Sequence, residues 1–194
     1  MLLLIITFVS TSHYRIENEQ YLIKIIEGEY DEPGVKCGYM NLKGDTIIPL
    51  GKYLYCYTDT LKNFAVVLDH DYRCLAIDRK GKELYEVYWY DNGPDYVSDG
   101  LFRIVKNGKI GYANEHGNIV IKPVFECANP FEHGIARVTY KCERTVEGEH
   151  VRMKSTGWFY INTNGQKVSD LELPPEEIQD HKERSSGEQQ EIQK

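Results

Sequence analysis

A turn-forming pattern recurs four times along this chain of 194 residues and constrains the fold more than any other sequence feature. Each copy starts with an apolar residue, has Tyr or Ala third, and runs through Asn or Asp to a glycine. The copies are Cys37–Gly44, Cys74–Gly81, Ile110–Gly117 and Trp158–Gly165. Their closing glycines are 37, 36 and 48 residues apart. Self-similarity at a near-constant period is typical of a repeat architecture.

Each copy predicts a strand that ends in a tight turn. The Asn or Asp side chain can accept hydrogen bonds from backbone a residue or two ahead, which starts a turn. The glycine three residues later can adopt a positive φ without a steric penalty. The expected turn residues are Asn41, Gly44, Asp78, Gly81, Asn114, Gly117, Asn162 and Gly165.

The third copy predicts a complete three-strand meander. Asn107-Gly108 is a strong signal for a two-residue hairpin turn. Pro123 has no backbone N–H and is expected to end the ladder pairing. The three strands are expected at Leu101–Val105, Lys109–Asn114 and Ile119–Ile121.

The fold class that follows is all-β. One three-strand meander cannot bury its apolar face alone, so neighbouring units must stack. We expect tandem meander or hairpin repeats stacked as an open, twisted, solenoid-like array, with a partial propeller as the alternative. The 15 tyrosines agree with this class, because tyrosine suits a half-buried pleated surface.

The third copy also resembles a known family. The segment Gly100-Leu101 … Asn107-Gly108-Lys109-Ile110-Gly111-Tyr112 … Gly117 … Pro123 … Phe131 is similar to the bacterial WG-repeat (KWG-repeat) family. Ile110 stands where that family has Trp, and the fourth copy keeps Trp158 but follows it with Phe159. The resemblance covers about residues 20–168. It implies a β-rich repeat array, with no catalytic residues to carry over and no single shared activity.

The chain is expected to divide into three segments. Residues 20–168 are expected to form four repeats, with a hairpin insertion at 141–156. Residues 169–194 are expected to form a polar tail that is either a frayed helix or disordered. Residues 1–19 contain the apolar run Leu2–Val9 without a basic n-region before it. This segment is either a signal-like sequence or a first strand. The run is too short for a transmembrane helix, and localisation stays open between cytoplasmic and exported.

Charge and cysteine spacing exclude several classes of site. The net charge of −7 argues against nucleic acid as a partner, because phosphate binding needs a basic face. None of the five cysteines forms a C-x-x-C pair, so neither a metal site nor a complete disulfide framework is signalled. Cys37 and Cys74 share one repeat position, so both are expected to be buried free thiols. No cofactor is expected.

Two segments are candidate contact surfaces. The insertion is rich in charged residues and is expected to project into water as an extended hairpin; insertions in repeat proteins often lie on the binding face, although a tolerated loop extension is the plainer interpretation. The strands Tyr53–Tyr57 and Tyr85–Tyr90 could form a stacking platform, but core packing is favoured. The candidate contact residues are Arg144, Glu147, Glu149, His150, Arg152, Tyr88, Trp89 and Tyr90.

No convergent catalytic group is recognisable, so the chain is not expected to be an enzyme. The histidines fall in turns, loops, the insertion or the tail. Asp69-His70-Asp71 is a possible cluster, but it coincides with an expected hairpin turn. The favoured hypothesis is a non-catalytic binding or scaffold module with an unidentified protein partner. The alternative is an exported carbohydrate- or envelope-binding protein. A hydrolase with a dispersed His/Asp site is weighed below both.

Overall fold

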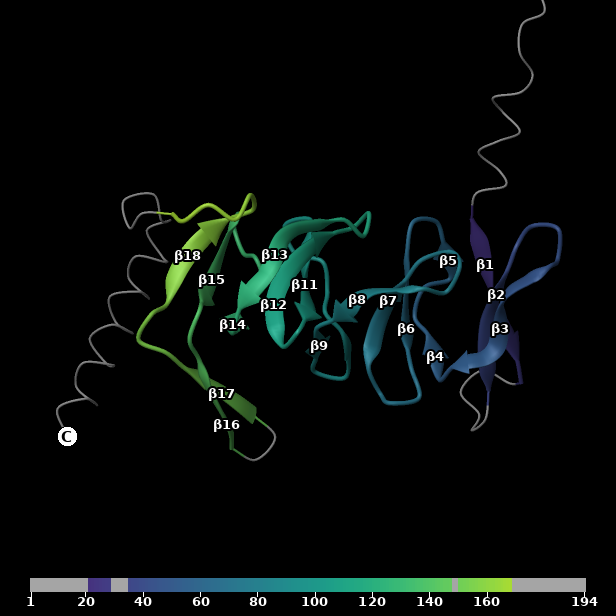
Figure 1. Ribbon diagram of the computed structural model, residues 1–194, viewed down its shortest axis with the longest axis horizontal. Helices are drawn as coiled ribbons and strands as arrows, with labels where there is room; N and C mark the ends of the chain where they lie inside the picture. Colours follow the sequence, from purple (N-terminus) through teal and green to yellow (C-terminus); the bar gives the residue numbers. More distant parts are fainter. Residues whose placement is uncertain (1–20, 29–34, 148–149, 169–194) are drawn as a thin grey trace, which may run out of the picture. The chain divides into compact units, whose positions relative to one another are not determined.

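The protein is all-β over the residues that the structure describes. The computed structural model describes residues 21–28, 35–147 and 150–168 (Figure 1). Every regular element there is a strand, every named strand pairing is antiparallel, and none of the sheets closes into a barrel. The predicted signal-like segment and the tail lie outside the described residues.

Contacts divide the chain into two compact units, Met1–Leu84 and Tyr85–Lys194. The first contains the first two repeats. One sheet has the strand order β3-β2-β1-β5, and β4, β6 and β7 pair in that order. The strands are β1 (Leu22–Glu27), β2 (Lys36–Met40), β3 (Thr46–Tyr53), β4 (Tyr55–Cys56), β5 (Thr60–Leu61), β6 (Ala65–Leu68) and β7 (Cys74–Ile77).

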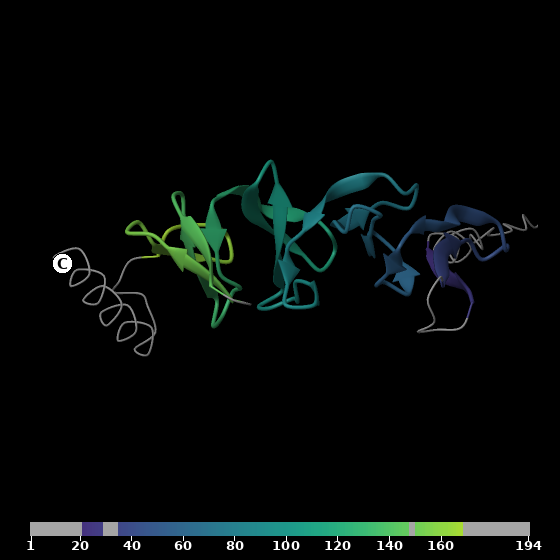
Figure 2. The same ribbon diagram turned by 90° about the horizontal axis from the view of Figure 1, so that it is seen from below.

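The second unit contains the third and fourth repeats, and the chain enters it within β8 (Glu83–Val87). Strands β13, β12, β11 and β8 are neighbours in that order, and β14, β15 and β18 form a second sheet (Figures 1 and 2). The strands are β9 (Trp89–Tyr90), β10 (Gly93–Pro94), β11 (Leu101–Lys106), β12 (Lys109–Asn114), β13 (Ile119–Phe125), β14 (Cys127–Ala128), β15 (Ile135–Thr139), β16 (Glu143–Glu147), β17 (His150–Lys154) and β18 (Phe159–Asn162).

The meander predicted for the third repeat is confirmed. Strands β11 and β12 pair from Leu101↔Asn114 to Lys106↔Lys109, and β13 follows as the third strand. The prediction that Pro123 ends the pairing is wrong, because β13 continues to Phe125. The register shifts between Tyr112↔Ile121 and Ile110↔Phe125, and Pro123 lies within this irregularity, where no ladder N–H is needed.

The first repeat has the same irregularity. Tyr39 pairs with Ile48 and Cys37 with Tyr53, so β3 also carries extra residues opposite β2. The fourth repeat differs: in the described part of the chain, the pairing after β18 continues as the isolated bridge Ile161↔Lys167.

Each unit has its own apolar core. In the first, Tyr39, Ile48 and Leu61 are fully buried. In the second, Tyr112 and Phe131 meet edge to face with ring centroids 4.7 Å apart, and Ile161 packs in the same cluster. Burial at repeat-equivalent positions explains why the pattern recurs. How successive repeats are stacked remains a prediction.

Candidate functional site

The four repeat turns share one hydrogen-bond geometry. In the third, the Asn114 side-chain oxygen accepts from the N–H groups of His116 (3.1 Å) and Asn118 (3.0 Å), and Gly117 N–H donates to the Asn114 carbonyl. Gly117 has φ +82°, where a glycine is favoured. Equivalent bonds are made at Asn41, Asp78 and Asn162. The predicted turn residues therefore lie in turns and build the scaffold.

The Asp69-His70-Asp71 segment forms a fifth turn of this kind. The Asp69 carboxylate accepts from the N–H groups of Asp71 and Arg73 and pairs with the Arg73 guanidinium at 2.7 Å. His70 Nε2 lies 3.1 Å from the Gly51 carbonyl oxygen. These contacts give Asp69 and His70 structural roles.

An exposed aromatic surface lies on β9 and the segment that follows β10. Trp89, Tyr90, Tyr96 and Val97 are each between 43% and 50% exposed. The rings of Tyr90 and Tyr96 meet edge to face with centroids 5.6 Å apart. The expectation that the aromatic strands pack in the core holds for Tyr53 and Tyr85, but not for Trp89 and Tyr90. We call these four residues the aromatic surface.

A buried ion pair holds the aromatic surface in place. Arg103 is 3% exposed and Asp95 is 9% exposed. The Asp95 carboxylate accepts from Arg103 N–H (2.7 Å), Nε (3.0 Å) and Nη2 (2.5 Å). The guanidinium lies over the rings of Tyr88 and Tyr90, 4.3 and 5.2 Å from their centroids. A fixed base of this kind reduces the conformational freedom that the rings lose when a partner binds.

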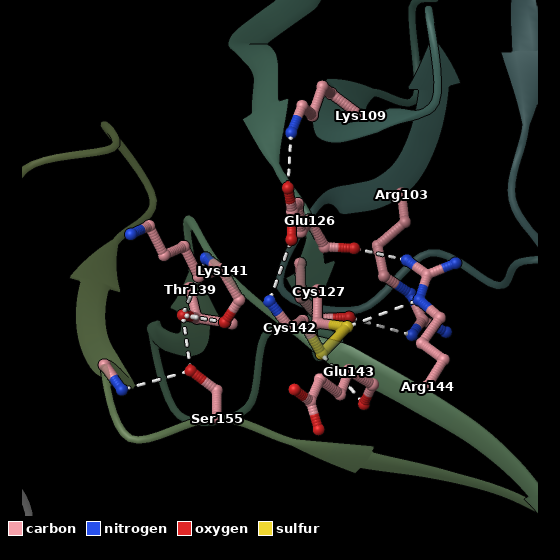
Figure 3. Close-up of a disulfide and its surroundings, with 12 residues drawn as sticks. Arg103, Lys109, Glu126, Cys127, Thr139, Lys141, Cys142, Glu143, Arg144 and Ser155 are labelled. Atoms are coloured by element: carbon pink, nitrogen blue, oxygen red, sulfur yellow. Dashed lines mark hydrogen bonds and ion pairs between the residues drawn. A yellow bond between two sulfur atoms is a disulfide. The ribbon is translucent and has the colours of Figure 1, made fainter.

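The charged insertion is the β16–β17 hairpin, which projects from the β14-β15-β18 sheet (Figure 1). Of the predicted contact residues, Glu147, His150 and Arg152 lie on its paired strands, and Glu149 lies outside the described residues. Arg144 lies at its root. Its Nε is 3.3 Å from the sulfur of Cys127, and its Nη2 donates to the Glu126 carbonyl (Figure 3).

A polar network ties the root of this hairpin to the sheet (Figure 3). Glu126 accepts from Lys109 Nζ and from Cys142 N–H, each at 2.8 Å. These two donors, Lys109 first, hold the pKa of the Glu126 carboxyl below its usual range. The hydroxyls of Thr139 and Ser155 are hydrogen-bonded at 2.9 Å. The root is therefore fixed on both strands of the hairpin.

An open groove of about 830 Å³ lies beside this root. The half-buried Cys142 lines it, and Tyr140 forms part of its wall. The exposed Tyr140 ring packs on Phe125 and Phe159, with centroids 5.3 and 5.2 Å away. The groove is thus lined by one exposed aromatic ring and one half-buried, disulfide-bonded cysteine.

Two disulfides correct the cysteine prediction. Cys37 is not a free thiol: it is bonded to Cys56, with Cα atoms 6.1 Å apart, because β4 folds back beside β2. Cys127 is bonded to Cys142, with Cα atoms 5.8 Å apart. Cys74 is buried, as expected, and belongs to neither of these disulfides. The shared repeat position of Cys37 and Cys74 therefore does not give them a shared role.

Among the described residues, no group of three or more His, Cys, Asp and Glu side chains is placed to hold a metal ion. In the same part of the chain, no helix is long and apolar enough to cross a membrane.

Comparison with known families identifies the repeat. The family model described as the WG-containing repeat matches residues 110–141, which run from β12 through β15. The chain contains a WG repeat at these residues. No curated protein and no solved structure matches the chain.

The structure explains the glycine of the WG repeat. A Cβ on Gly111 would lie 2.5 Å from the carbonyl oxygen of Ile121 and 2.5 Å from the nitrogen of Pro123. A Cβ on Gly38 would meet Ile48 O at the same distance. Each glycine lies where the backbone of the third strand of its repeat comes closest to the second strand. The second and fourth copies of the sequence repeat have Leu75 and Phe159 at this position.

The main structural pair of the aromatic surface was missed at the sequence level. Arg103 interrupts the apolar strand Leu101–Lys106, and a lone cation there is a signal for a buried partner. Its partner Asp95 follows a segment of turn-forming residues, so no sequence signal indicated a buried carboxylate there. Arg137 occupies the equivalent position in the fourth repeat, 4.7 Å above the Trp158 ring.

Proposed function

We propose that this WG-repeat protein is a non-catalytic binding module that recognises a protein partner through the aromatic surface. The observation that supports this proposal most directly is a set of large, nearly half-exposed rings that a buried ion pair holds from beneath. Trp and Tyr are enriched among the residues that contribute most to protein interfaces. A pre-ordered surface loses less side-chain entropy on binding, which favours affinity.

We further propose that the protein works in an oxidising compartment. Two of its disulfides lie within the described residues, and disulfides persist mainly in exported proteins. The apolar run Leu2–Val9 is compatible with an export signal. Both observations support the exported alternative over the cytoplasmic one.

The partner should be sought with the oxidised full chain as bait in the cell-envelope fraction of its own host. Once the captured protein has been purified, calorimetry should give its Kd for the wild type and for Trp89→Ala and Tyr90→Ala. We expect each substitution to weaken binding about tenfold or more. Tyr72→Ala is the matched control, because Tyr72 is 76% exposed and lies outside the aromatic surface. Equal affinities for all four proteins would contradict the proposal.

A carbohydrate partner is the second candidate. Trp89 lies beside the exposed polar residues Asp91 and Asn92, and its Nε1 donates to the Asp91 carbonyl. A ring next to hydroxyl-binding side chains suits a sugar face. Titration with cell-wall oligosaccharides should then change the Trp89 fluorescence in the wild type and in Trp158→Phe. A change that persists in Trp89→Phe would place the sugar elsewhere.

A further inference from the structure

We infer that the Cys127–Cys142 disulfide is a thiol-exchange site, attacked at Cys142, with Cys127 as the leaving thiolate held by Arg144. Three observations on this bond support the assignment. The two cysteines differ in exposure, Arg144 contacts the sulfur of Cys127, and among the described residues the Cys37–Cys56 disulfide shows neither feature.

Exposure selects the sulfur that is attacked. Cys127 is fully buried, whereas Cys142 is half-buried and lines the open groove at the hairpin root. Thiol–disulfide exchange requires a thiolate to reach one sulfur in line with the S–S bond, so access decides which sulfur it attacks. The groove leads a thiol to Cys142.

The charge of Arg144 selects the leaving group. Its Nε lies 3.3 Å from the Cys127 sulfur (Figure 3). A guanidinium at this distance favours the thiolate over the thiol and opposes the effect of burial. A leaving thiol that forms its thiolate more readily departs faster. Arg144 is therefore a positioning and charge-stabilising residue for the exchange.

The reaction balances with an external dithiol as reductant. Its thiolate bonds to Cys142 Sγ, the S–S bond breaks, and the electron pair leaves on Cys127 as a thiolate. The second thiolate of the reagent then attacks the reagent sulfur of the mixed disulfide and releases the Cys142 thiolate. The dithiol is oxidised to a disulfide, and the cystine is reduced to two thiols by two electrons. A monothiol stops at the mixed disulfide on Cys142.

The Cys37–Cys56 disulfide provides an internal comparison. Both of its cysteines are buried in the core of the first unit. The hollow beside them measures about 10 Å³, room for no more than about one water molecule. The nearby ammonium of Lys24 binds the Cys56 carbonyl oxygen and the Asp59 carboxylate. This bond should exchange only when the unit opens.

The first experiment uses the unmodified full chain. Brief exposure to dithiothreitol, alkylation and peptide mapping should label Cys127 and Cys142 at least about tenfold faster than Cys37 and Cys56. Exposure to glutathione should place the mixed disulfide on Cys142. Equal rates for the two disulfides, or glutathione on Cys127, would overturn the inference.

The second experiment tests Arg144. Arg144→Gln should slow the exchange about threefold or more, and Arg144→Lys should restore part of the rate. Lys122→Gln is the charge-matched control, because it removes one exposed cation from β13. In the Cys142→Ser background, Arg144→Gln should raise the pKa of the Cys127 thiol, followed by thiolate absorbance. An unchanged rate together with an unchanged pKa would remove Arg144 from the mechanism.

Discussion

The first and third repeats have equivalent strands, but different contacts hold each repeat together. Cys37 pairs with Tyr53 as Ile110 pairs with Phe125, and Cys56 ends β4 as Ala128 ends β14. A disulfide in the first repeat therefore stands where the third has two apolar side chains in one core cluster.

The cross-strand cation differs in the same way. Lys24 pairs with Tyr39 across β1 and β2, and Arg103 pairs with Tyr112 across β11 and β12. The partner of Lys24 is the carboxylate of Asp59, whose side chain is 82% exposed, whereas the partner of Arg103 is buried. The two repeats thus share their strand pairing, whereas the contacts that close each repeat differ.

The largest expected effect separates the two ion pairs. Asp95→Asn leaves the buried Arg103 guanidinium without its carboxylate and should lower the free energy of unfolding by about 3–5 kcal/mol. Asp59→Asn should cost about 1 kcal/mol or less, because the Asp59 carboxylate is exposed to solvent and an ion pair with an exposed partner contributes little. Urea unfolding followed by fluorescence reports Asp95→Asn directly, because both tryptophans lie in the second unit. Circular dichroism serves for Asp59→Asn. Similar losses of unfolding free energy in the two variants would show that the two ion pairs do not differ in their contribution to stability.

A second test of this comparison replaces the disulfide of the first repeat by the apolar residues of the third. Cys37→Ala with Cys56→Ala should destabilise the first unit by about 3 kcal/mol, through the lost cross-link and the cavity left behind. Cys37→Ile with Cys56→Ala installs the residues of the third repeat and should recover part of this loss. Hydrogen exchange resolved by residue measures the first unit separately. If both double variants lose the same stability, the two kinds of contact are not interchangeable.

The shared glycine should be sensitive in both repeats. Gly38→Ala and Gly111→Ala each force a Cβ against the backbone of the third strand and should cost about 1–3 kcal/mol. Gly93→Ala is the control, since no atom lies within 4 Å of its Cβ position and its φ is not positive. Thermal unfolding distinguishes them. A Gly111→Ala protein as stable as Gly93→Ala would show that the close approach can relax freely.

The smallest expected effect concerns the turns and pH. Hydrogen bonds from the Lys82 and Lys80 N–H groups hold the pKa of the Asp78 carboxyl below its usual value, and desolvation only partly opposes them. Because the folded pKa is the lower one, Asp78 stabilises the fold above about pH 4. This contribution disappears as the pH falls through the folded pKa.

Asp78→Asn should therefore reduce the acid sensitivity of the first unit, and Asn114→Asp should add such sensitivity to the second. Amide exchange compared between pH 6 and pH 3 measures both. Identical pH profiles for wild type and variants would contradict this account of the turns.

Sequence reasoning found the features that depend on local chemistry. Asn114, Gly117 and Asn107-Gly108 encode their turns within a few residues, so the meander of the third repeat was predictable. The irregularity at Pro123 was not, because it depends on how β13 crosses Gly111. The period indicated a repeat architecture, and the strand and turn signals indicated that the repeats are all-β.

The candidate site depended on tertiary pairing and was found only in part. Trp89 and Tyr90 were named, but nothing local shows that Asp95 turns inward to meet Arg103, eight residues later. The disulfides join cysteines 19 and 15 residues apart, and no sequence spacing signals either pair. Arg144 looked like a solvent-facing charge because its contact with Cys127 exists only once β14 and the hairpin root meet.

The two disulfides also have a mechanical consequence. Each closes a covalent ring, so the segment between its cysteines, which are 19 or 15 residues apart, cannot lengthen when the chain is pulled from its ends. At about 3.5 Å per extended residue, the rings withhold roughly 65 and 50 Å of contour length. Strand β15 lies inside the second ring. A thiol that opened this ring under load would release this length at one defined place, the root of the β16–β17 hairpin.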